Sequence, residues 1–90
     1  MPRFNITTPA PVQITTGAVS KVRVQNIGQW PVELMVSTAG APASWDDALV
    51  IYSKGMLTAE NLISAYWPAF ATGIIWARLR TYDTVLLVAQ

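Results

Sequence analysis

The chain has 90 residues, 52% of them hydrophobic and only 12% charged, with a formal net charge of +1 and neither cysteine nor histidine. Without those two residue types the chain lacks disulfides, the thiolate and imidazole ligands of most metal sites, and the commonest general base. The balanced charge lacks the basic footprint of a nucleic-acid binder, and no apolar run approaches the roughly 20 residues of a membrane-spanning helix. We therefore expect no enzyme, no cofactor or metal, and neither a nucleic-acid nor a membrane partner.

Short runs rich in Thr, Val, Ile and aromatic residues alternate with Gly, Pro, Asn and Asp, which is typical of strands separated by turns. In chain order, these runs predict a single helical turn near 63–67 and strands at 4–8, 12–15, 21–25, 32–37, 49–52, 56–62, 74–81 and 84–89. Two neighbouring pairs have connections short enough to predict hairpins, one over 21–37 and one over 74–89. Residues 37–48 are expected to form a long loop.

This even spacing of strands and turns predicts an all-β fold, namely a small β-sandwich, or a jelly roll or barrel, of seven to eight short antiparallel strands. We expect one domain over residues 1–90, in which residues 1–11 can extend as an N-terminal arm. A domain of this size buries roughly 64% of its unfolded surface, which leaves little interior for so many apolar side chains. Another copy of the chain is the simplest cover for the remainder, so we expect a homo-oligomer.

The last two predicted strands indicate where such copies meet. In the strand at 74–81, Ile75, Ala77 and Leu79 share one face and predict the core face. An isoleucine, a tryptophan and two arginines on the other face therefore point outward. Tryptophan and arginine are enriched at interface hot spots. The strand at 84–89 is apolar on both faces and should be covered on both sides, unless it crosses from one core to another in a twisted barrel. The candidate interface residues on these strands are Trp76, Arg78, Arg80 and Leu87.

Three further tryptophans lie in or beside connections. Trp30 at a hairpin tip and Trp45 in the long loop are either exposed anchors or lids folded back over an end of the domain. Trp67 precedes Pro68 and is expected to plug the core. Phe4, Trp30 and Trp45 complete the candidate subunit or shell interface.

Charged residues offer weaker alternatives. Asp46 and Asp47 could supply ligands to a hard cation, but calcium takes six to eight oxygens, so a solvated turn is the simpler interpretation. Glu60 and Asp83 would form a carboxylate pair only by accident of the fold. A basic stripe for single-stranded nucleic acid would need several interleaved aromatic residues, and only Trp76 qualifies. The stripe would consist of Lys21, Arg23, Arg78 and Arg80.

Several short stretches resemble, in their order, the layout of the small β-rich virion structural proteins of tailed bacteriophages. They are Gln25-Asn26-Ile27-Gly28, Pro31-Val32, Ala39 to Ser44, Leu57-Thr58-Ala59-Glu60 and Tyr66-Trp67-Pro68. The resemblance spans nearly the whole chain and implies a capsid decoration, or cement, protein. Such a protein is made in the host cytoplasm and is typically a homotrimer bound to the major capsid protein on the outer surface of the head. Members of this group also serve as tail or fibre components, and the matching stretches carry no site residues.

A second interpretation, from a different class of protein, is a small carbohydrate-binding module in which Trp30 and Trp45 stack on sugar rings. Such a site needs exposed aromatic residues beside free carboxylates or amides. A cement protein instead needs its aromatic residues covered in the assembly.

Overall fold

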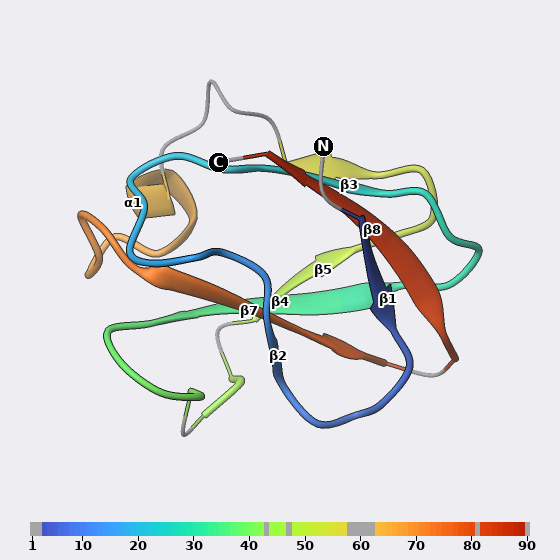
Figure 1. Ribbon diagram of the computed structural model, residues 1–90. Coiled ribbons are helices and arrows are strands. Elements are labelled where there is room, and N and C mark those ends of the chain that lie inside the picture. The colour runs from blue at the N-terminus through green and yellow to red at the C-terminus, as the bar shows by residue number, and fades with distance from the viewer. Residues whose placement is uncertain (1–2, 43, 47, 58–62, 81, 90) are drawn as a thin grey trace.

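The computed structural model describes residues 3–42, 44–46, 48–57, 63–80 and 82–89, which form two packed antiparallel sheets and one short helix (Figure 1). Sheet A contains, from edge to edge, β1 (Arg3–Ile6), β8 (Thr84–Ala89), β3 (Arg23–Asn26) and β6 (Met56–Leu57). Sheet B contains β2 (Val12–Gln13), β7 (Ile74–Leu79), β4 (Val32–Ser37) and β5 (Leu49–Ile51). The predicted all-β fold is confirmed, and within the described residues it is a two-sheet sandwich rather than a closed barrel.

The core lies between the sheets and follows the predicted alternation of side chains. In β4 the even-numbered positions are buried, and in β8 the same holds over the whole length of the strand. Because β8 keeps one face toward the core throughout, it does not cross between two cores. The fully buried side chains in the middle of the strands are Val24, Leu34, Ile75, Ala77, Leu86 and Val88.

The accessible surface of the chain is 4902 Å². This value is close to the roughly 5,200 Å² expected for a compact monomeric protein of this mass. The sandwich therefore closes its own core, and a second copy would add cover to the outside rather than complete the inside.

A short helix, α1 (Ile63–Tyr66), confirms the predicted helical turn. Its first residue is buried and its backbone N–H donates to the carbonyl oxygen of Ser20 at 2.9 Å. Trp67 follows with only 4% of its surface exposed, as predicted for a core residue. The first two residues of the predicted strand at 56–62 form β6, and residues 58–62 lie outside the described part of the chain.

Both predicted hairpins are wrong. β3 lies in sheet A between β8 and β6, whereas β4 lies in sheet B between β7 and β5. β7 and β8 are divided between the sheets in the same way. Alternation shows which side chains face the core, but it does not show which strand lies alongside, because a strand in either sheet presents the same pattern. Short connections here cross between sheets instead of turning within one.

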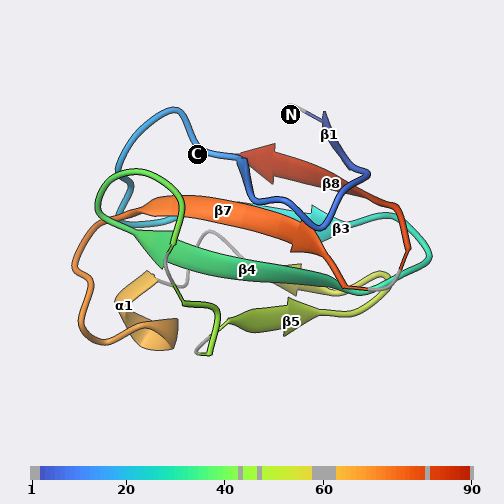
Figure 2. The same cartoon turned by 90° about the horizontal axis from the view of Figure 1, so that it is seen from below.

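Three such crossings gather at one end of the sandwich (Figures 1 and 2). They are residues 27–31 between β3 and β4, residues 52–55 between β5 and β6, and the connection between β7 and β8. We call this end of the molecule the crossing end.

A buried asparagine connects the three crossings. The side chain of Asn26 is fully shielded from solvent. Its Nδ2 donates to the carbonyl oxygens of Trp30 at 2.8 Å and Ile51 at 3.0 Å, while its Oδ1 accepts from the Gly28 N–H at 3.1 Å and the Thr84 hydroxyl at 2.6 Å. These four bonds use the full hydrogen-bonding capacity of an amide side chain. Asn26 therefore joins the first crossing to the end of β5 and the start of β8, which border the other two crossings.

The close approach of two crossings requires glycine at position 28. A Cβ added to Gly28 would lie 2.8 Å from the backbone nitrogen of Val85 and would overlap the side chain of Thr84. The backbone of the first crossing therefore packs directly on the start of β8.

We predict that Asn26→Ala lowers the free energy of unfolding by roughly 3 kcal/mol, because it leaves several buried partners without a hydrogen bond. Urea denaturation should show a lower midpoint with an unchanged slope. Asn5→Ala, at an exposed position of β1, is the matched control and should stay within about 0.5 kcal/mol. Equal effects of the two substitutions would contradict the role of Asn26.

A second prediction compares two glycines. Gly28→Ala should destabilise the fold by about 1–3 kcal/mol, since the added methyl group has no room beside Thr84. Gly17→Ala should be neutral or slightly stabilising, because no other group lies within 4 Å of the place that the new methyl carbon would take. Thermal denaturation of both variants tests the difference, and a stable Gly28→Ala variant would show that the crossing can shift away from β8.

Candidate functional site

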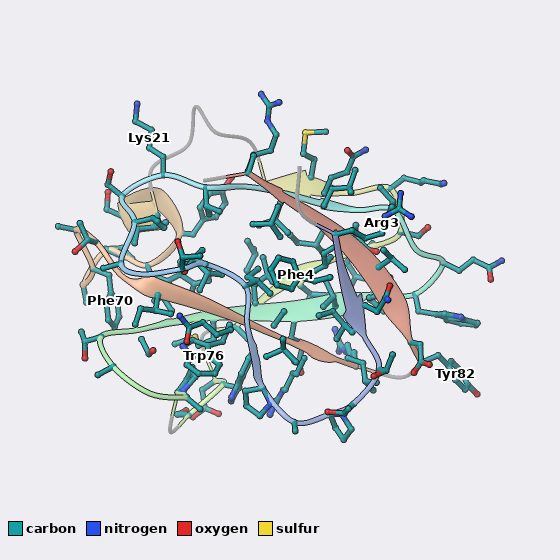
Figure 3. All side chains as sticks on the ribbon, viewed as in Figure 1. Arg3, Phe4, Lys21, Phe70, Trp76 and Tyr82 are labelled. Atoms are coloured by element: carbon teal, nitrogen blue, oxygen red, sulfur yellow. The ribbon has the colours of Figure 1, made fainter. Side chains whose placement is uncertain are left out.

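The seven residues predicted as an interface do not form one site. They fall on both outer faces of the sandwich, at the crossing end and between the sheets. Leu87 faces outward on sheet A, and Trp76 and Arg78 face outward on sheet B, where Trp45 contacts Arg78. Trp30 lies at the crossing end, Arg80 is exposed just after β7, and Phe4 is half-buried against the core (Figure 3).

Trp76 is held by the start of the 37–48 loop. Its indole Nε1 donates to the Ser37 hydroxyl at 2.8 Å, and that hydroxyl donates to the carbonyl oxygen of Gly40 at 2.7 Å. The indole is half-buried in the isolated chain. Hydrogen bonds within the chain therefore fix the orientation of Trp76.

The predicted pairing of arginine with tryptophan exists, but with a different tryptophan. The Arg78 guanidinium carbon lies 4.3 Å from the ring centroid of Trp45, and its Nε donates to Glu33 Oε1 at 2.8 Å. Both contacts are partly solvated, so each contributes modestly to stability. Figure 2 shows the loop after β4 passing across β7 and β4. The loop after β4 thus covers part of the outer face of sheet B.

Sheet A presents a different outer face. Strand register places Arg3, Leu87, Gln25 and Met56 in one row across its four strands. Met56 is 48% exposed, and Leu87 is half-buried with its neighbours Val85 and Ala89 on the same strand. This row, in which Leu87 and Met56 are apolar and an arginine lies at one end, is called the sheet A row.

Sequence reasoning missed an apolar edge beside β5 and β6. Tyr52 is 65% exposed and Tyr66 37% exposed, and with Met56 they line an open cleft of about 260 Å³. Leu49 and Val50 form its floor. The available signal was the run Leu49-Val50-Ile51-Tyr52, which is apolar at successive positions and so cannot hide both faces at the edge of a sheet.

Sequence reasoning also assigned Tyr82 only to a turn, whereas the structure brings it to Trp30. The two rings lie 4.6 Å apart between centroids, at an interplanar angle of 52°, and both are exposed. An adjoining cleft of about 440 Å³ is lined by residues of two crossings, of β1 and of the start of β8, among them the polar residues Asn5, Gln29 and Asp83. This surface, centred on Trp30, is called the end cleft, and Figure 3 shows Tyr82 pointing outward beside it.

Groups for metal binding or acid–base chemistry are sparse. Asp46 is exposed and its backbone N–H donates to the Ser44 hydroxyl at 3.2 Å, whereas Asp47 and Glu60 lie outside the described residues. Within the part of the chain that the structure describes, no three His, Cys, Asp or Glu side chains lie close enough to hold a metal ion. In the same residues, no helix has the length and hydropathy to cross a membrane.

The structure thus offers three surfaces on which a function can be argued: the sheet A row, the apolar edge beside it and the end cleft. The first two share Met56. The third is more polar and lies apart from the loop over sheet B. No protein-family model, no characterised protein and no solved structure matches this chain.

Proposed function

We propose that the chain is a non-enzymatic structural protein that assembles with copies of itself and decorates the capsid of a tailed bacteriophage as a cement protein. The observation that carries this proposal is the sheet A row, which leaves Leu87 and Met56 partly exposed beside the apolar edge with Tyr52. Apolar patches of this kind on small proteins usually mark contacts with other proteins.

The charges on this surface favour one kind of self-association. Arg3 lies at the end of the sheet A row and Arg23 pairs with Ala89 on the neighbouring strand. The one ion pair among the described residues joins Arg78 to Glu33, so neither of these arginines is neutralised there. A two-fold contact of the face with itself would bring like charges together. A head-to-tail ring, in which the face meets a different surface of the next copy, avoids this repulsion.

Asp46 is a suitable partner for the arginines in such a ring. It is exposed and forms no ion pair with a described residue. A closed ring of three copies is the smallest head-to-tail assembly that closes, and it agrees with the trimer implied by the resemblance to phage decoration proteins. Burial across its joints would stabilise each copy and, on the head surface, the major capsid protein beneath.

A tail or fibre component would use the same apolar surfaces, and binding to empty phage heads separates these two roles. Cosedimentation with heads is expected for a decoration protein. Failure to bind heads, combined with a stable oligomer, would instead favour a tail or fibre position.

We predict that Leu87→Ser disrupts the oligomer, because it places a hydroxyl in the middle of the buried joint. Light scattering after size exclusion should show a monomer, while circular dichroism shows unchanged strand content. Ile74→Ser is the matched control, since Ile74 also faces outward and is half-buried, but on sheet B. That variant should keep the oligomer.

Two results would contradict this assignment of the joint. A wild-type protein that stays monomeric at high concentration would remove the self-association altogether. Disruption by Ile74→Ser rather than by Leu87→Ser would move the joint to sheet B.

A further inference from the structure

We infer that the end cleft is a carbohydrate-binding site, in which a neutral pyranose ring stacks on Trp30. This inference does not rest on the proposed assembly, because the end cleft and the sheet A row are different surfaces. It starts from the aromatic pair of Trp30 and Tyr82, whose exposed fractions of 42% and 60% are high for such large side chains.

The spacing of the two rings favours a flat ligand that stacks on one ring over a cation that is held between both rings. A quaternary ammonium group held between two rings needs van der Waals contact at roughly 3.5–4 Å on each side, so the ring centres must lie about 7 Å or more apart. The Trp30 and Tyr82 centroids are only 4.6 Å apart, and the rings touch each other. Tyr82 therefore supports one side of the Trp30 indole, and the ligand would stack on the other side. A pyranose ring offers an apolar C–H face of matching size.

The polar lining of the cleft suits hydroxyl groups. Asn5 and Gln29 offer amides that both donate and accept, and Asp83 offers a carboxylate that accepts. All three side chains are exposed and form no hydrogen bond with another described residue, and the same holds for the Trp30 indole N–H. Sugars carry hydroxyls that donate and accept around an apolar ring, which is the combination that these groups recognise.

The charge of the residues that line the end cleft limits the charge that its ligand can carry. Among the described residues that line the cleft, Asp83 is the only charged one, and none of them is a lysine or an arginine. A phosphate, sulfate or carboxylate group would therefore meet repulsion without a compensating cation. Neutral sugars are the class that remains.

The cleft is also rigidly supported from below. Asn26 bonds the backbone of Trp30 and of Gly28 and the hydroxyl of Thr84, all of which belong to the walls of the end cleft. A site whose walls share one buried support does not need to be ordered by its ligand, which lowers the entropic penalty of binding. Trp45, the other tryptophan suggested for sugar stacking, has the guanidinium of Arg78 over its ring and lacks a free face on that side.

The test is a titration of the full-length protein with chitohexaose, cellohexaose and maltohexaose at millimolar concentration, followed by the indole N–H signals in a proton–nitrogen correlation spectrum. Trp30→Phe assigns the Trp30 signal. At least one oligosaccharide is expected to shift this signal in a saturable way and to leave the Trp67 and Trp76 signals in place. Choline chloride is titrated separately as the competing ligand class.

Variants then test the assigned groups. Trp30→Ala and Asp83→Asn should each weaken binding by about tenfold or more. Tyr52→Ala, which removes an exposed aromatic ring that does not line the end cleft, should leave the affinity unchanged.

Three outcomes overturn the inference. The first is that none of the three oligosaccharides shifts the Trp30 signal. The second is that choline alone binds, which would assign the cleft to a cation. The third is that Tyr52→Ala weakens sugar binding as much as Asp83→Asn does. The Trp30 signal is read on the wild-type protein, so a variant that fails to fold does not affect the first two.

Discussion

The structure depends on one buried side chain, Asn26. A sandwich whose connections cross between sheets must bend its backbone at one end, and bent backbone leaves polar groups that strands would otherwise pair. Asn26 supplies both donors and both acceptors of its amide to these groups, joining three crossings that are distant in sequence. Because an unsatisfied buried polar group is expensive, any rearrangement of one crossing would strain the other two. The crossing end is therefore held as a unit.

This constraint divides the surfaces of the molecule. Sheet B is partly covered by the loop that carries Trp45. Sheet A keeps partly exposed Leu87 and Met56, with two arginines nearby that form no ion pair with a described residue. The end cleft lies over the Asn26 support and carries amides, a carboxylate and an exposed indole. Flat apolar faces suit association with other protein surfaces, whereas a supported cleft with convergent polar groups suits a small ligand. A decoration protein that displays a sugar-binding end away from its joints would combine the two.

Candidate sites could be predicted from the sequence only in part. The sequence allowed Trp30 and Trp45 each to be either an exposed anchor or a lid folded over the domain. In the structure the Trp30 indole is exposed, whereas the Trp45 indole lies under Arg78. The contact between Tyr82 and Trp30 was missed because the two residues are more than 50 positions apart in the sequence, and no local pattern indicates such a contact. The row across sheet A was missed for the same reason, since it joins strands from both ends of the chain.

By itself, the sequence determined the all-β class, the positions of most strands, the short helical turn and the inward faces of the strands at 32–37 and 74–79. These properties are local: a period of two, turn residues and proline act within a few positions of the chain. Only the tertiary structure decided which strands lie side by side. β3 ends at Asn26 and β4 begins at Val32. Their side chains would alternate in the same way whether the two strands paired as a hairpin or lay in different sheets. The choice was made by packing the two inward faces against each other and by satisfying one buried amide, and both are interactions between residues far apart in sequence.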